Sequence, residues 1–73
     1  EIDPKTKLQE YSLKYFKKLP TYKVLSYEGP QHKPSYKVSV KIHDSKFFYG
    51  TGNSKKIAEH NAARKIIKDL KIK

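Results

Sequence analysis

The residues best suited to chemistry lie near the C-terminus, where a glycine-containing turn leads into a helix. Asn53 and Ser54 stand there immediately before Lys55 and Lys56. Ser54 is a good N-cap residue, because its hydroxyl accepts a hydrogen bond from a free N–H of the first turn. A helix N-terminus carries partial positive charge and unpaired N–H donors, and two lysines there work against the helix dipole. We interpret the pair as a site for an external anion, most simply phosphate; a solvated helix start is the alternative.

The charge of the chain narrows the class of partner. Its 73 residues include seventeen Lys and Arg against seven Asp and Glu, which gives a net charge of +10. Such an imbalance favours a polyanionic partner, most often nucleic acid, over an anionic membrane or simple solubility. Sixteen of the seventeen basic residues are Lys. Lysine acts as a point charge rather than a bidentate fork, so contact with phosphate is better supported than reading of bases.

Catalytic, metal and membrane functions find little support. The seven acids are scattered, and the three His residues lack the spacing of metal ligands, so we predict no catalytic or metal site. No apolar run approaches the roughly 20 residues of a membrane span, and the N-terminus lacks the pattern of a signal peptide. The chain has no Cys, which is compatible with a reducing compartment. We therefore expect a cytoplasmic protein without a membrane partner.

Five segments are expected to position the charged residues. Asp3 followed by Pro4 predicts a helix over residues 4–18, which Pro20 ends. Period-two patterns predict strands over 22–28, 36–42 and 47–52, although the two faces of the first strand are not cleanly separated. A second helix is predicted over 54–70. The apolar side of the first helix is predicted to comprise Leu8, Tyr11, Tyr15, Phe16 and Leu19.

The order of these segments predicts the architecture. Short connections favour an antiparallel meander, and two helices suffice to cover one of its faces. We expect an α+β fold, an α-β-β-β-α two-layer sandwich in which two helices pack on one face of a three-stranded antiparallel sheet. Residues 1–73 would form a single domain, with 1–3 as the remnant of a linker and 71–73 as a frayed tail. Gly50 and Gly52 are expected to take backbone angles that other residues avoid.

Five short patterns follow one another along the chain: Lys5-Thr6-x-Leu8-Gln9-Glu10, Leu19-Pro20-x-Tyr22, Gly29-Pro30-x-His32, Tyr36-x-Val38-x-Val40, and Gly50-x-Gly52-x-Ser54-Lys55-Lys56-x-Ala58-Glu59-x-x-Ala62-Ala63. Each alone is weak. Their order and spacing together resemble a double-stranded RNA-binding domain (dsRBD) over nearly the whole chain. Asp3 with the first pattern, and Glu59 where many family members have a third basic residue, are similar to the C-terminal domain of bacterial-type ribonuclease III.

The resemblance implies three patches that contact RNA. The first patch comprises Thr6, Gln9 and Glu10 on the first helix, with Leu13 as a further candidate. The second patch is the loop with Pro30, Gln31, His32 and Lys33, in which the backbone carbonyls of Pro30 and Gln31 would be exposed acceptors; Lys33 adds to the second or the third patch. The third patch comprises Asn53, Ser54, Lys55 and Lys56. Glu59 stands four residues beyond Lys55 and is expected to hold its side chain.

The resemblance also implies a function. The chain would bind double-stranded RNA through 2′-OH and phosphate contacts, as the substrate-binding module of a ribonuclease III-type enzyme. It would itself carry no catalytic residue and no cofactor, with magnesium expected only in the absent nuclease domain. The module would be monomeric and the parent a homodimer. The alternative is a stand-alone or ribosome-associated dsRNA-binding or protein-interaction module that uses the open sheet face, although Lys37, Ser39 and Lys41 are predicted there.

Overall fold

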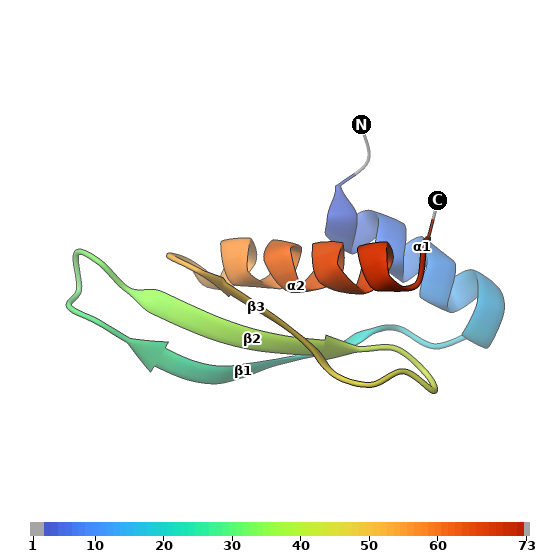
Figure 1. Ribbon diagram of the computed structural model, residues 1–73, viewed down its shortest axis with the longest axis horizontal. Helices are drawn as coiled ribbons and strands as arrows, with labels where there is room; N and C mark the ends of the chain where they lie inside the picture. Colours follow the sequence, from blue (N-terminus) through green and yellow to red (C-terminus); the bar gives the residue numbers. More distant parts are fainter. Residues whose placement is uncertain (1–2, 73) are drawn as a thin grey trace.

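The computed structural model describes residues 3–72 as a helix, three strands and a second helix. The elements are α1 (Pro4–Phe16), β1 (Thr21–Glu28), β2 (Ser35–Lys41), β3 (Phe48–Gly52) and α2 (Lys55–Asp69). The strands form one antiparallel sheet in the order β1-β2-β3. Both helices lie on the same side of this sheet (Figure 1). The predicted two-layer α-β-β-β-α fold is confirmed.

The two helices contribute unequally to the apolar layer. Helix α2 lies along β2 and β3, whereas α1 packs chiefly against α2. The core combines one buried leucine of α1 with alternate residues of the sheet and the inner face of α2. Its members are Leu8, Val40, Ile42, Phe48, Ala62, Ala63, Ile66 and Ile72. The core is small, so the placement of α1 also depends on polar contacts.

Helix α1 ends earlier than the sequence pattern indicates. Lys17 takes a left-handed conformation with a φ of 59°, and its N–H donates to the carbonyl of Leu13 over 3.1 Å. The helix therefore stops at Phe16 through this C-cap, and the prediction that it continues to Lys18 is wrong. Tyr15 and Leu19 are 59% and 60% exposed, so their predicted place on the buried side is wrong as well.

Asp3 and Ile72, near the two limits of the described residues, both take part in the fold. The side chain of Ile72 is only 8% exposed in the core, and its N–H donates to the carbonyl of Ile67 over 2.9 Å. The prediction of a frayed tail is therefore wrong at Ile72, while Lys73 lies outside the described residues. Residues 1–2 of the expected linker also lie outside them. Asp3 already belongs to the helix start, because its carbonyl accepts from the N–H of Lys7.

One salt bridge and one further polar contact hold α1 against α2. Lys5 Nζ lies 2.8 Å from Glu59 Oε1, and the Glu59 side chain is only 12% exposed. His60 Nε2 lies 3.2 Å from Asp3 Oδ1. Glu59 thus pairs with the neighbouring helix, and the prediction that it holds Lys55 is wrong.

The phenol ring of Tyr22 lies beside the Lys5–Glu59 pair. Lys5 Nζ is 4.9 Å from the centroid of the Tyr22 ring. The hydroxyl of this ring is buried without a hydrogen-bond partner among the residues that the structure describes. Burial raises the pKa of the Tyr22 phenol far above its usual value, and the negative charges of Glu59 and Asp3 add to the rise. The phenol therefore stays neutral and serves as packing surface for the Lys5 ammonium.

Strand β3 approaches α2 so closely that backbone touches backbone. A Cβ atom added at Gly50 would lie 2.2 Å from the nitrogen of Ala62 and 2.4 Å from the carbonyl oxygen of Ala58. At Gly52 it would lie 2.8 Å from the nitrogen of Ala58. Neither glycine has a positive φ, so the expectation of unusual backbone angles is wrong. These positions require glycine because there is no room for a side chain.

Substitution of Gly50 by Ala should destabilise the fold. The new methyl group would meet backbone atoms that cannot rotate away, so we expect a loss of at least about 3 kcal/mol from the free energy of unfolding. A domain of this size has about 5 kcal/mol in total. Urea unfolding followed by circular dichroism measures the loss. Thr51→Ala, at the exposed neighbouring position, is the control and should cost less than about 1 kcal/mol. Equal midpoints for the two variants would contradict the close contact.

Substitution of Glu59 by Gln should loosen α1. The amide oxygen still accepts from Lys5 Nζ but carries no negative charge, so the half-buried ammonium loses an ion-pair attraction worth about 1 kcal/mol. Thermal unfolding should show the corresponding decrease in Tm. Glu28→Gln removes the same charge at an exposed position at the end of β1 and is the matched control. If both variants melt at the same temperature, the Lys5–Glu59 pair does not stabilise the fold.

Candidate nucleic-acid interface

The third patch is an exposed helix start held in a defined conformation. Ser54 is extended, with φ −145° and ψ 160°, and its Oγ accepts from the N–H of Ile57 over 3.1 Å. The first turn of α2 contains no acidic residue, and Lys55 and Lys56 are both exposed. Among residues 3–72, neither lysine forms an ion pair. The predicted N-cap is confirmed, and two uncompensated cations stand where the helix dipole is already positive.

A hydrogen-bond chain fastens this helix to the sheet. Asn61 Nδ2 donates to the carbonyl of Thr51 over 2.7 Å, and Arg64 Nη1 donates to Asn61 Oδ1 over 3.0 Å. The carbonyl of Thr51 lies in β3, just before the turn that carries Asn53. The sequence analysis missed Asn61. Its signal was an asparagine inside a helix, where this residue is unfavourable unless its amide has a specific partner.

The second patch is the loop between β1 and β2. Gly29 has a φ of 94°, and the N–H of Lys33 donates to the carbonyl of Pro30 over 2.9 Å. Residues 30–33 are all exposed. The carbonyl of Pro30 therefore has one of its two lone pairs occupied within the loop and one left for an outside donor. This turn presents the imidazole of His32 to solvent at the tip of the β1–β2 hairpin.

The first patch lies on α1. Thr6, Gln9, Glu10 and Leu13 are all exposed. The hydroxyl of Thr6 donates to Asp3 Oδ2 over a long 3.4 Å, so this interaction is weak and leaves the hydroxyl available. Because the Lys5–Glu59 pair and the buried Leu8 fix the opposite side of α1, these four residues are held facing outwards.

The three patches follow one another along the molecule. The β1–β2 loop lies at one end of the long axis, the N-terminal end of α2 comes next, and α1 lies towards the other end (Figure 1). The longest dimension of the domain is 40 Å. The loop and the lysine-bearing helix start thus share one end of the molecule. This order suits an extended ligand that meets a loop, a cationic centre and a helix in turn.

Among residues 3–72, no three side chains of the His, Cys, Asp or Glu type come together in a way that would hold a metal ion. In that part of the chain neither helix has the length and apolar character needed to cross a membrane. The surface formed by the three patches is therefore the best candidate site.

The chain matches a known family and known proteins over most of its length. The family described as "Double-stranded RNA binding motif" matches residues 4–70. Ribonuclease 3 of Pelagibacter ubique (strain HTCC1062) is 59% identical over 70 residues, which cover 96% of this chain and 32% of that protein. Ribonuclease 3 of Leptospira interrogans is 46% identical over 71 residues, covering 97% of this chain and 29% of that protein. The chain spans less than a third of the length of these relatives.

Solved structures show the same fold. The solution structure of both dsRBDs of DRB4 with their linker superposes with a TM-score of 0.73 at 32% identity, covering 96% of this chain and 45% of that one. The second dsRBD of DRB4 alone gives a TM-score of 0.68, also at 32% identity, and covers 96% of this chain and 97% of that one. The match of residues 4–70 and these likenesses confirm the resemblance found in the sequence, and the chain belongs to the double-stranded RNA-binding domain family.

Proposed function

We propose that this domain holds double-stranded RNA for a ribonuclease III-type endoribonuclease, and that it recognises the shape and backbone of the duplex. The observation that carries the proposal is the pair Lys55 and Lys56, exposed at a helix start that Ser54 caps and that no acidic residue of the described chain neutralises. The relatives named Ribonuclease 3 support the choice of parent.

The shape of A-form RNA explains why three separate patches are needed. Its major groove is too deep and narrow for side chains to read, whereas its minor groove is wide and lined with 2′-hydroxyls. A domain lying along the duplex therefore meets a minor groove, then the phosphates that border the major groove, then the next minor groove. The order of loop, helix start and α1 along the 40 Å axis supports this arrangement.

Each patch has chemistry suited to its place. Lys55 and Lys56 supply point charges for phosphates on the two sides of the major groove, and the N–H groups around Asn53 and Ser54 add to the attraction. In the minor grooves, Gln9 offers both a donor and an acceptor, and Glu10 accepts a hydrogen bond from a 2′-OH. His32 donates or accepts at a hydroxyl in the other groove. None of these contacts depends on the identity of a base.

The lysine pair can be tested directly. The double variant Lys55→Ala with Lys56→Ala should lose nearly all affinity for a duplex RNA, because two phosphate contacts disappear at the centre of the interface. A slope of about −0.9 in log K against log salt accompanies each neutralised phosphate in B-DNA. The residual binding should therefore show a slope smaller in magnitude by about two. Fluorescence anisotropy across a salt series measures both quantities.

A matched variant separates position from charge. Lys65→Ala with Lys68→Ala removes the same two charges from exposed positions further along α2. We expect that variant to keep most of its affinity. The Lys55→Ala, Lys56→Ala variant should melt no lower than the unaltered chain, because its two lysines oppose the helix dipole. Equal affinity losses for the two double variants would mean that general charge, rather than the helix start, binds the duplex.

The chemistry of cleavage is assigned to the rest of the parent protein. Ribonuclease III chemistry requires clustered carboxylates that hold magnesium. Here Glu59 pairs with Lys5 and Asp3 lies against His60, and among residues 3–72 no three acidic or His side chains come together in a way that would hold a metal ion. That the parent protein is a homodimer and lies in the cytoplasm are further predictions of this proposal.

Incubation of the domain with duplex RNA and magnesium tests this division. We expect the RNA to stay intact on a denaturing gel, because among residues 3–72 no group of carboxylates comes together to hold the metal ion. The informative comparison is the Lys55→Ala, Lys56→Ala variant under the same conditions. Specific cleavage by the unaltered chain, lost in that variant, would show that the domain itself carries a nuclease.

A further inference from the structure

The side of the sheet that faces away from both helices carries lysines and aromatic rings. Neighbouring residues of a strand point to opposite faces, and Val38 and Val40 are buried beneath α2. Lys37 and Lys41 therefore point the other way. The strand register places Lys23 opposite Ser39, and Ser39 opposite Tyr49. We call this surface the outer sheet face and define it by Lys23, Lys37, Lys41, Phe47 and Tyr49.

The two rings of the outer sheet face are accessible. Tyr49 is 42% exposed and Phe47 is 52% exposed, although both are large enough to be useful in a core. A lysine lies close to each of them. Lys37 Nζ is 5.3 Å from the centroid of Tyr49, and Lys41 Nζ is 5.1 Å from the centroid of Phe47. Cation–ring contacts of this kind hold both lysines flat on the sheet and keep their charges beside the rings.

The middle of this face is free of negative charge. The nearest acids along the described strands are Glu28, at the hairpin end of β1, and Asp44, in the turn after β2. Asp44 Oδ2 lies 3.7 Å from His43 Nε2, at the end of the face rather than in its middle. Three lysines therefore share the face without a carboxylate among them, and the surface is complementary to an anionic ligand.

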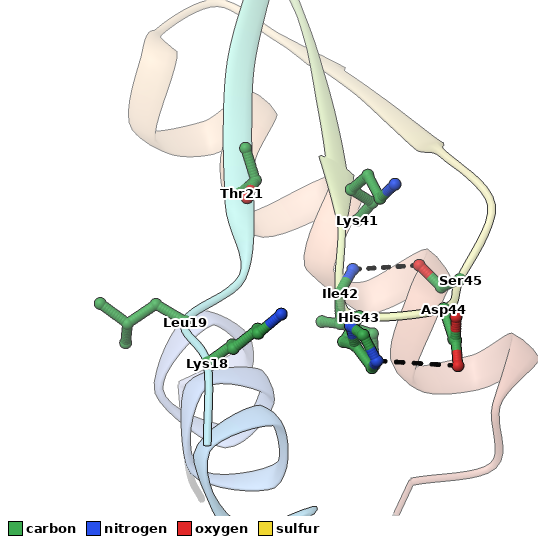
Figure 2. Close-up of a pocket in the computed structure, with 8 residues that line it drawn as sticks. All are labelled: Lys18, Leu19, Thr21, Lys41, Ile42, His43, Asp44 and Ser45. Carbon is green, nitrogen blue, oxygen red and sulfur yellow. Dashed lines mark hydrogen bonds and ion pairs between the residues drawn. The ribbon is translucent and has the colours of Figure 1, made fainter. Parts of the chain in front are cut away.

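A pocket continues the outer sheet face at its far end (Figure 2). It has a volume of about 510 Å³ and lies between the α1–β1 connection and the turn that follows β2. Lys41 of the outer sheet face lines the pocket together with Thr21, its partner in the strand register, and Lys18 enters the pocket from the α1–β1 connection (Figure 2). A chain lying across the sheet would meet Lys18 at the place where the strands end, in a pocket that Asp44 also lines.

The combination of rings and lysines indicates the kind of ligand. In duplex RNA the bases are stacked on one another and offer no free face to a ring. In a single strand the bases are available for stacking on aromatic side chains, while lysines neutralise the phosphates. An acidic protein surface could also pair with the lysines and cover the rings, so competition by an acidic polymer distinguishes the two kinds of ligand. We propose that the outer sheet face binds single-stranded RNA, separately from the three patches that serve the duplex.

The position of the face makes double occupancy feasible. The duplex patches lie on the helices and at the hairpin tip, whereas the outer sheet face is the opposite side of the sheet (Figure 1). An RNA with a duplex and an unpaired flank could then bind both surfaces of one domain, the duplex on the three patches and the flank on the outer sheet face. The proposal therefore predicts two independent binding sites. Loss of single-strand binding would contradict it without affecting the proposed duplex binding.

The first test measures binding of a fluorescein-labelled oligo(U) of about ten nucleotides, which cannot pair with itself. The variant Phe47→Thr with Tyr49→Thr keeps residues that suit a strand but removes both rings. We expect its affinity for oligo(U) to fall at least about tenfold, with duplex affinity and Tm unchanged. Tyr15→Gln is the matched control, since Tyr15 is also exposed and lies beside Lys14, but on α1. It should bind oligo(U) as the unaltered chain does.

A second pair of variants keeps the proposal testable if loss of the rings harms the fold. Lys37→Gln with Lys41→Gln should weaken oligo(U) binding, whereas Lys65→Gln with Lys68→Gln, which removes the same charge from α2, should have a much smaller effect. The Lys55→Ala, Lys56→Ala variant should still bind oligo(U). On the unaltered chain, saturating unlabelled duplex should leave oligo(U) bound.

Three results would overturn the proposal. The first is an unaltered chain that does not bind oligo(U) at low salt. The second is displacement of oligo(U) by duplex RNA, which would place both ligands at one site. The third is competition by poly-glutamate as strong as that by unlabelled oligo(U), which would identify the face as a surface for acidic proteins.

Discussion

The contact between β3 and α2 at Gly50 determines the rest of the arrangement. Because Gly50 has no side chain, the strand backbone reaches the backbone of the helix at Ala58 and Ala62. The helix cannot slide or roll there without a collision, since both sides of the contact are rigid. The contact lies only two turns from the start of α2, so it also decides where Lys55 and Lys56 stand relative to the sheet. A packing constraint thus determines the position of the charged site.

Helix α1 depends on a different kind of interaction. Leu8 is the only fully buried apolar residue of this helix, so apolar packing alone gives α1 a small area of contact with the core. The half-buried pair between Lys5 and Glu59 completes the attachment, with the neutral ring of Tyr22 beneath the ammonium. Such pairs fix geometry more than they add stability. An α1 that is held by directional contacts can keep its exposed side, and with it the first patch, in one orientation.

The sequence patterns predicted both helices and all three strands, since hydrophobic period is a local property that a chain this short displays clearly. The errors lie where a distant residue decides. Glu59 matches the i, i+4 rule with Lys55, yet α1 supplies a stronger partner that no local rule could reveal. Lys17 adopts a positive φ although it is not a glycine. Ile72 is buried in a core whose other members include residues far away in the sequence. The exposed residues of the patches follow from the pattern, but their order along the long axis required the structure.

The two faces of the sheet are linked by strand register. In β2 the buried Val38 and Val40 alternate with Lys37 and Lys41, so a slip by one residue would bury both lysines and expose both valines. Strand β1 absorbs an extra residue through a bulge between Val24 and Ser26, after which the remaining pairs keep the same two faces. This bulge explains why the two sides of β1 are not cleanly separated in the sequence. The apolar residues that hold α2 in place therefore also hold the cations on the opposite face, and neither surface can change its register alone.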